Sequence, residues 1–335
     1  MSETGAVAER GLPSVGAVTA DAGSFAAPLG RRAFIAGTAG AVAGAALLES
    51  PARAAEPEYS AFQVVTPTRL VDTRPEMGNF GYTRIDSRVI RIQVTGREIT
   101  GSDETVPAEA TAAVFTLVGL NRSLAGNFLS AYPTGTSWPG TANLNMTGFN
   151  DVSPNLVTVK LGDGGSVDVY SQWGSEIVLD LVGVYLPTGG ERVRSGRYRL
   201  LNSVRRVLDT RELGPAPRAG EVVRVDLTSL RDEGVLDDGA IAVSANITAV
   251  QANRGFIAAY PFGIEWPGTS TLNVAQGATR GIGTMVQLGE EDGRVGFNVF
   301  LEAGAHLVID VAGFMTGERS ATSTTGQFVA IEPSR

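Results

Sequence analysis

Residues 178–183 read VLDLVG and residues 308–313 read VIDVAG, so an apolar stretch with one central carboxylate occurs twice. A run of aliphatic and β-branched residues of this length predicts a strand that is largely buried. Because a lone buried charge is costly, each carboxylate, Asp180 and Asp310, should have a basic partner elsewhere in the fold. The repetition predicts that two parts of the chain fold in the same way.

Other segments also occur twice, in the same order and at similar spacing. They are an Arg-x-x-Asp-Thr-Arg motif, an Ala-Tyr-Pro-x-Gly turn and a Trp-Pro-Gly-Thr turn. The matching residues are 69–74 with 206–211, 131–135 with 259–263, and 138–141 with 266–269. A repeat of this length indicates an internal duplication. We predict module 1 over residues 58–187 and module 2 over residues 196–315.

The local pattern inside the modules is β throughout. Residues 241–249 alternate between apolar and smaller or polar side chains with a period of two. Asp-Gly pairs at 163–164 and 292–293 lie between strand-like runs, where hairpins favour positive φ. The predicted fold class is all-β, with two tandem antiparallel β-sandwiches that are jelly-roll-like.

The C-terminus repeats the beginning of a module. Module 1 starts with an aromatic residue and a short strand at 62–69, module 2 has the same pattern at 198–206, and residues 328–335 read FVAIEPSR. We expect residues 316–335 to hold a linker and a third copy of the leading strand. This copy would dock on module 2 as the segment around Tyr198 docks on module 1. The alternative is a frayed tail.

Residues 1–54 are typical of a twin-arginine export signal that is cleaved from the mature protein. Arg31 and Arg32 precede a weakly apolar run of alanine and glycine that is shorter than the roughly 20 residues needed to span a bilayer. Ala52 and Ala54 supply the small residues that a signal peptidase reads. No later apolar stretch is long enough to form a membrane span. We expect a protein that is secreted, or located at the cell surface, after export by the Tat pathway.

The composition excludes several kinds of site. The chain has no cysteine, a single histidine (His306) and a single lysine (Lys160), so disulfides, thiolate nucleophiles and sites with two imidazoles are excluded. The formal net charge of −8 disfavours nucleic acid as a partner, because its phosphates require a basic surface. No cofactor motif or metal-binding spacing is present, so we predict neither a cofactor nor a metal site.

These motifs together resemble a repeat of secreted and cell-surface proteins of high-GC Gram-positive bacteria. The resemblance rests on the Asp-Thr-Arg motif, the Tyr-Pro-x-Gly turn and the closing Asp-Val-x-Gly-aromatic strand, and it covers residues 62–315. In that repeat the modules stand alone or are appended to exported hydrolases. The resemblance implies an accessory, binding or structural role and brings no catalytic residues.

The strand carboxylates have a structural and a catalytic interpretation. The structural one pairs Asp180 with Arg74 and Asp310 with Arg211, because a guanidinium can hold a carboxylate through two hydrogen bonds. One such ion pair per module would tie the first strand to the last. The catalytic alternative makes Asp180 and Asp72, or Asp310 and Asp209, an acid–base pair as in glycosidases.

Aromatic residues in the turns are the candidate binding residues. Tyr132 and Trp138 in module 1 recur as Tyr260 and Trp266 in module 2. Exposed aromatic rings stack on sugar rings, and a duplicated pair offers bivalent binding. The alternative is that these residues cover a sandwich edge while proline and glycine shape the turns.

We therefore expect an exported, non-enzymatic protein that acts in adhesion, cell-envelope association or glycan binding. Its expected partner is a cell-wall or extracellular glycan. The alternative function is that of a secreted carbohydrate-active hydrolase with paired carboxylates.

Overall fold

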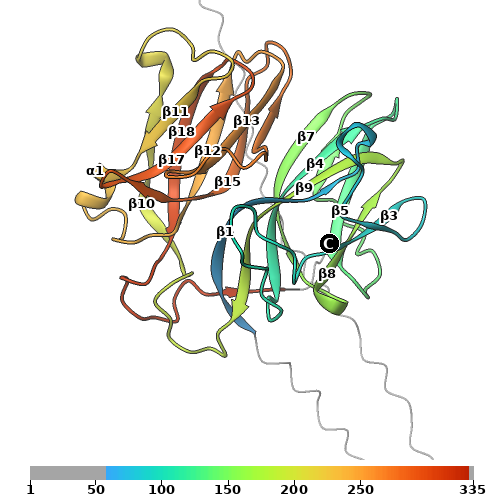
Figure 1. The fold of residues 1–335 in the computed structure, drawn as a ribbon, viewed down its shortest axis with the longest axis horizontal. Helices are drawn as coiled ribbons and strands as arrows, with labels where there is room; N and C mark the ends of the chain where they lie inside the picture. The colour runs from blue at the N-terminus through green and yellow to red at the C-terminus, as the bar shows by residue number, and fades with distance from the viewer. Residues whose placement is uncertain (1–57, 332–335) are drawn as a thin grey trace, which may run out of the picture. The chain divides into compact units, whose positions relative to one another are not determined.

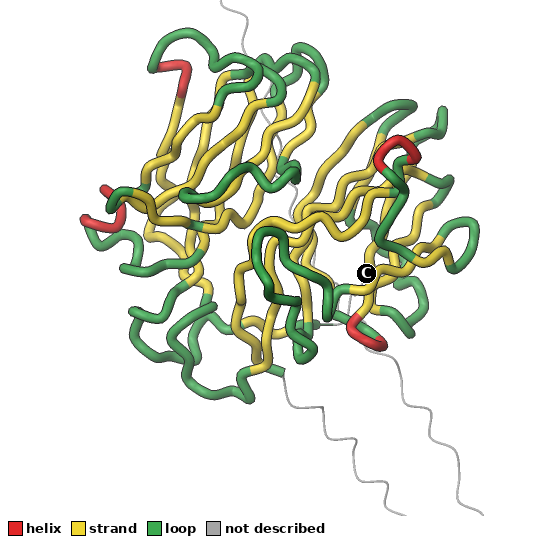
Figure 2. The backbone as a smooth tube through the Cα atoms, viewed as in Figure 1, coloured by secondary structure: helices red, strands yellow, loops and turns green. Residues whose placement is uncertain are grey.

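The computed structural model describes residues 58–331, in which nearly all regular structure is strand (Figures 1 and 2). The only α-helix in this range, α1, spans Thr228–Asp232, and no helix in it is long and apolar enough to cross a membrane. The predicted export signal, with Arg31 and Arg32, lies outside the described residues. The predicted all-β class is confirmed.

The strands of module 1 form two antiparallel sheets in jelly-roll order. One sheet has the order β19-β1-β9-β4-β7, and the other has the order β2-β3-β8-β5-β6. Each sheet therefore places strands side by side that are distant in the sequence, such as β1 and β9. The strand bounds are β1 Tyr59–Asp72, β2 Thr83–Arg84, β3 Val89–Gln93, β4 Ala112–Asn121, β5 Asn127–Pro133, β6 Leu144–Met146, β7 Val152–Lys160, β8 Ser166–Ser171, β9 Ser175–Pro187 and β19 Phe328–Val329.

Module 2 repeats four strands of each of these sheets in the same order, without counterparts of β2 and β19 among the described residues. Its sheets have the orders β10-β18-β12-β15 and β11-β17-β13-β14, with the short β16 added beside β17. The duplicated sequence therefore gives a duplicated jelly roll, as expected. The strand bounds are β10 Tyr198–Asp209, β11 Val222–Asp226, β12 Ala242–Val250, β13 Gly255–Pro261, β14 Leu272–Val274, β15 Arg280–Gln287, β16 Gly289–Glu291, β17 Arg294–Leu301 and β18 His306–Met315.

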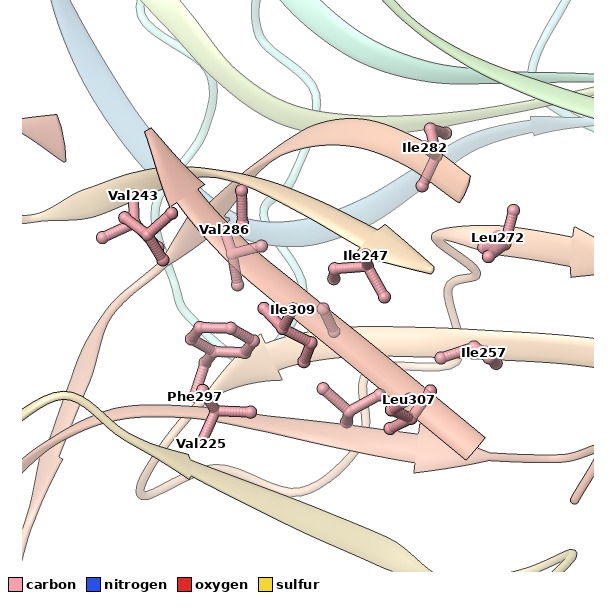
Figure 3. Close-up of a cluster of buried hydrophobic side chains, with 14 of the residues drawn as sticks. Val225, Val243, Ile247, Ile257, Leu272, Ile282, Val286, Phe297, Leu307 and Ile309 are labelled. Atoms are coloured by element: carbon pink, nitrogen blue, oxygen red, sulfur yellow. The ribbon is translucent and has the colours of Figure 1, made fainter. Parts of the chain in front are cut away.

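Apolar side chains from the two sheets of each module meet in a core between them. In module 2, Val243 and Ile247 of β12 and Phe297 of β17 belong to this core (Figure 3). Ser244 and Asn246 lie at the alternate positions of β12 and point to the opposite face of the sheet. Full burial of one such apolar side chain contributes roughly 1.5–3 kcal/mol. The period-two pattern read from residues 241–249 thus places the core correctly.

The three leading segments contact one another in a repeating way. The backbone N–H of Phe62, which leads module 1, donates to the carbonyl of Gly196, two residues before Tyr198. The N–H of Tyr198, which leads module 2, donates in the same way to Gly326, two residues before Phe328. Both bonds are 2.8 Å long. Each leading segment is therefore bonded to the next one along the chain.

The third leading segment closes this set on the first. In β19, Phe328 pairs with Ser60 of β1, two residues before Phe62. The three leading segments therefore contact one another in a closed series, twice through a backbone hydrogen bond and once through strand pairing. The expected docking on module 2 is present through Gly326, but the strand pairing itself is made with module 1, which was not expected.

Modules 1 and 2 also contact each other through unlike surfaces. The outer face of the β1-β9-β4-β7 sheet in module 1 meets β15 and the Trp-Pro-Gly-Thr turn of module 2. At this contact the Ser270 N–H donates to Asp180 at 3.1 Å, and Arg280 donates to the carbonyl of Val152 and the hydroxyl of Ser153, both at 2.8 Å. Apolar residues of both modules also share a small core there, including Val114 and Met315.

The equivalent outer face of module 2 has a different composition. The β-ladder aligns Val114 with Ser244 and Thr116 with Asn246, because these pairs lie opposite equivalent residues of β9 and β18. Val114 and Thr116 are buried, whereas Ser244 is half-buried and Asn246 is exposed. Equivalent positions are thus buried in module 1, as valine and threonine, and more exposed in module 2, as serine and asparagine.

Candidate functional site

A cluster of three aromatic rings lies on module 1. We call it aromatic cluster 1; it consists of Phe128 on β5, Tyr170 on β8 and Trp138 in the turn after β5. The Trp138 and Tyr170 rings are stacked, with centroids 4.7 Å apart and an interplanar angle of 11°. Phe128 lies 5.9 Å from Trp138. Neighbouring strands therefore bring together residues from three separate segments.

Module 2 carries an equivalent cluster. Aromatic cluster 2 consists of Phe256 on β13, Phe300 on β17 and Trp266 in the turn after β13. Trp266 stacks on Phe300 with centroids 4.7 Å apart and an angle of 22°, and Phe256 lies 5.6 Å from Trp266. The geometry is conserved between the two copies, so the cluster belongs to the module rather than to one accidental contact.

Both tryptophans are fixed by a hydrogen bond and yet remain exposed. The indole Nε1 of Trp138 donates to the Thr141 carbonyl at 3.2 Å, and that of Trp266 donates to the Thr269 carbonyl at 2.9 Å. The two residues are 41% and 39% exposed. An indole whose only donor is used within its own turn presents mainly apolar area to solvent.

The two tyrosines that were expected beside the tryptophans are not available to a ligand. Tyr132 and Tyr260 are each only 5% exposed, and burial raises the pKa of both hydroxyl groups. Tyr132 lies opposite Asp168 on the neighbouring strand, where a bidentate ion pair between Asp168 and Arg91 occupies the same face. Each tyrosine lies on the same face of its sheet as the aromatic cluster, but neighbouring side chains cover it, so the predicted role of Tyr132 and Tyr260 in binding is not supported.

The sequence-based hypothesis missed Phe128, Phe256 and the equivalence of Tyr170 with Phe300. A signal was present, because Phe128 and Phe256 precede the matching Ala-Tyr-Pro turns by the same spacing. Tyr170 and Phe300 occupy equivalent positions, because Tyr170 lies opposite Ser130 and Phe300 lies opposite the equivalent residue Ala258.

Cluster 1 continues into one further aromatic ring and a cation. Trp173 is exposed, and the Arg88 guanidinium lies 5.7 Å from the centroid of its ring. Arg88 also donates to the Tyr170 hydroxyl at 3.2 Å. The surface around cluster 1 therefore combines apolar ring area with hydrogen-bond donors.

The strand carboxylates are paired with arginines other than those predicted. Asp180 is held by Arg69 through two hydrogen bonds of 2.8 and 3.1 Å, and Asp310 by Arg206 through bonds of 2.9 and 3.1 Å. The predicted Arg74–Asp180 pair is wrong, since the ladder places Arg69 directly opposite Asp180. A bulge on each side of that point sets this register.

The second arginine of each Arg-x-x-Asp-Thr-Arg motif instead pairs with the aspartate two residues earlier. Arg74 donates to Asp72 at 2.8 and 2.6 Å, so the predicted role of Arg74 is replaced by a local pair. Arg211 holds Asp209 in the same way, and the predicted Arg211–Asp310 pair is also wrong. The hydrogen bond from Arg211 lowers the pKa of Asp209 to about 2.

In module 1, the two carboxylates of the catalytic interpretation, Asp72 and Asp180, are both held in ion pairs with arginine. Arg69 lies between Asp180 and Asp72, with an ion-pair distance of 3.6 Å to Asp72. The Asp180 side chain is only 2% exposed. Burial raises the pKa of Asp180, and the hydrogen bonds from Arg69 oppose that rise. Among residues 58–331, no three histidine or carboxylate residues lie together as metal ligands.

A cleft lies where cluster 2 faces module 1. Its volume is about 360 Å³. Trp266 and Phe256 of module 2 line it, together with Val118 and Val178 of module 1. Arg254 lies at this cleft as well, and the sequence analysis did not single it out.

No family model and no curated protein matches the chain. Among solved structures, one similar chain is the N-terminal CBM22-1–CBM22-2 tandem domain of Xyn10C from Paenibacillus barcinonensis. Sequence identity is 12%, the match covers 76% of this chain and 98% of the other, and the TM-score is 0.21. A similarity at this level supports no functional statement, so the residues of the chain itself must supply the function.

Proposed function

We propose that this protein binds carbohydrate through its two exposed aromatic clusters and has no catalytic activity of its own. The observation that supports this proposal is the duplicated tryptophan, hydrogen-bonded at its indole nitrogen and about two-fifths exposed in both modules. Fixed aromatic rings present flat apolar area at little entropic cost. The C–H faces of a sugar ring match that area, while its hydroxyl groups remain in water.

The electrostatics support a glycan over other polymeric partners. The formal net charge is −8, which opposes binding to the phosphates of nucleic acid. Hydrogen-bond donors are nevertheless present beside cluster 1, where Arg88 contacts Tyr170 and Trp173. Local donors around an apolar ring suit a neutral or weakly charged polyhydroxylated ligand.

Binding is favoured over catalysis by the state of the carboxylates. A general acid and a nucleophile must reach the scissile bond, and in retaining or inverting glycosidases two carboxylates flank the sugar. Here Asp72 and Asp180 are buried and share Arg69, so neither offers a free oxygen to a substrate. The ion pair between Arg69 and Asp180 joins the first and last strands of module 1, and this structural role explains why Asp180 is present in a buried strand.

The proposal includes the location of the protein. The twin arginines at 31 and 32 and the small residues at 52 and 54 support export by the Tat pathway. A chain without cysteine folds without oxidation, which suits a route that carries folded proteins. The site of action would be the cell surface or the medium, where glycans are abundant.

The test uses the two tryptophans and a matched control. Trp138→Ala, Trp266→Ala and the double variant are compared with Phe149→Ala, which removes an exposed aromatic residue outside both clusters. Binding is measured to a glycan array and to purified cell walls. We expect each tryptophan variant to lose affinity about tenfold, which corresponds to roughly 1.4 kcal/mol, and the double variant to lose retention on polymeric glycan.

The control variant should bind as the unmodified protein does. Circular dichroism and thermal melting check that all variants are folded. Unchanged binding by the folded double variant, or hydrolysis of a glycan that is lost in Asp180→Asn without a change in melting temperature, contradicts the proposal.

A further inference from the structure

We propose that the cleft between cluster 2 and module 1 is selective for an acidic sugar, whose ring stacks on Trp266 and whose carboxylate pairs with Arg254. This inference rests on the proposed function and names the ligand class for one of its two sites. The cleft holds about 360 Å³, which is sufficient for one or two sugar residues.

The walls of the cleft differ in a way that suits a sugar ring. Trp266 and Phe256 of module 2 provide ring faces, and half-buried aliphatic residues of β4 and β7 in module 1, Leu120 and Val152, also line the cleft. A sugar ring has two C–H faces, so residues of both modules can contact it.

The charge balance of the cleft is positive in a protein that is negative as a whole. Three guanidinium groups line it, those of Arg69, Arg74 and Arg254. Arg69 and Arg74 are neutralised by Asp180 and Asp72. Within residues 58–331, the guanidinium of Arg254 makes no hydrogen bond or ion pair, and only its backbone N–H is bonded, to Gln276. One uncompensated cation therefore remains.

Glu302, an acidic side chain next to Phe256, forms no ion pair with this cation. It accepts a hydrogen bond from the Phe256 backbone N–H at 3.3 Å and lies outside the residues that line the cleft. A guanidinium binds a carboxylate through two parallel hydrogen bonds, which favours a carboxylate-bearing ligand here. The equivalent position in module 1 is Gly126, so this cation is specific to module 2.

An acceptor without a partner adds a second indication of a ligand. The Oδ1 atom of Asn273, which lines the cleft, is buried and has no hydrogen-bond partner. Such an atom is costly unless a donor reaches it. The equivalent residue of module 1, Asn145, is exposed to water. A sugar hydroxyl at the cleft wall would supply the missing donor after a small shift of this side chain.

The experiment pairs acidic oligosaccharides with their own methyl esters. An array carries oligouronates of several kinds, each also in the esterified form, in which the ring is unchanged and the charge is removed. The unmodified protein, Arg254→Gln, Trp266→Ala and a control, Arg218→Gln, are applied to it. Arg218 is an exposed arginine of the same module outside the cleft.

We expect the unmodified protein and Arg218→Gln to bind the acid form about tenfold or more tightly than the ester, because a charge-assisted pair is stronger than a neutral one. Arg254→Gln should reduce this ratio to about one and leave binding to the ester unchanged. Trp266→Ala should weaken both forms. The acid preference should also decrease with added salt.

Two failures can be told apart. Equal binding of acid and ester by the unmodified protein, with loss of both in Trp266→Ala, overturns the acidic-sugar inference and leaves carbohydrate binding intact. An acid preference that persists in Arg254→Gln overturns the role of Arg254. No binding to any glycan of the array overturns both the inference and the proposed function.

Discussion

Removing Arg69 should destabilise the protein far more than removing Arg206, although the two arginines make the same ion pair in the two modules. Arg69 and Arg206 each hold a strand aspartate through two hydrogen bonds. The Arg69 and Asp180 side chains are 19% and 2% exposed, whereas those of Arg206 and Asp310 are 52% and 21% exposed. The duplication thus provides an internal control for burial.

The magnitude follows from what remains around Asp180. In Arg69→Leu the carboxylate loses both bonds from the guanidinium and keeps only the 3.1 Å bond from the Ser270 N–H. An uncompensated buried charge of this kind costs about 3–5 kcal/mol. At about 2–4 °C per kcal/mol for a chain of this size, the melting temperature should decrease by roughly 6–20 °C. In Arg206→Leu, water can solvate Asp310, so the decrease should be much smaller.

The assay is thermal melting by circular dichroism, with urea unfolding as a second measure. Arg69→Leu combined with Asp180→Leu should recover most of the loss, since replacing a whole buried pair with apolar residues is often neutral. Equal destabilisation by Arg69→Leu and Arg206→Leu would refute the argument, because burial would then not determine the cost of the unpaired acid.

Three further outcomes are expected. Arg211 lowers the pKa of Asp209 from 3.8 to about 2, so the stability that this carboxylate adds is fully present above about pH 4 and is lost as the pH falls toward 2. Asp209→Asn should therefore make the urea midpoint depend less on pH between pH 4 and pH 2. The same pH dependence in the variant and the unmodified protein would contradict this. Phe328→Ala should lower the free energy of unfolding by about 1–2 kcal/mol and expose the C-terminal segment to protease, because the Phe328 ring stacks on Tyr185 with centroids 4.1 Å apart. Ile331→Ala, which changes an exposed residue, should alter neither measurement. Equal effects of the two substitutions would argue against the docked strand. Gly196→Ala should lower the melting temperature strongly, since the new Cβ would collide with the backbone of β1. Gly189 also has a positive φ but open space around it, so Gly189→Ala should cost only about 1 kcal/mol. Similar losses in the two variants would show that the positive φ, and not the collision, determines the loss of stability.

The β class, the duplication and the position of each core face could be predicted from the sequence. Alternation along residues 241–249 assigned Val243 and Ile247 to the core, because successive side chains of a strand point to opposite faces whatever lies beyond them. The matched motifs predicted that modules 1 and 2 have the same fold. Such features depend on neighbours along the chain, and the sequence contains them directly.

The partner of Asp180 could not be predicted in this way. Several arginines lie near it in the motif, and the choice of Arg69 over Arg74 depends on two bulges that shift the register of β1 against β9. A single inserted residue moves every later side chain to the other face of the sheet. Motif spacing alone does not contain that information.

The tertiary structure also decided which aromatic residues can bind. Tyr132 and Trp138 have the same sequence signal, but packing buries one ring and leaves the other exposed. The clusters unite residues from separate strands, and Arg254 and Trp266 line one cleft whose lining also includes residues of module 1. Sequence determined which residues repeat and which way each strand faces, because these are local properties. Contacts between distant segments determined which of the repeated residues remain open to a ligand, because burial depends on what packs above each one.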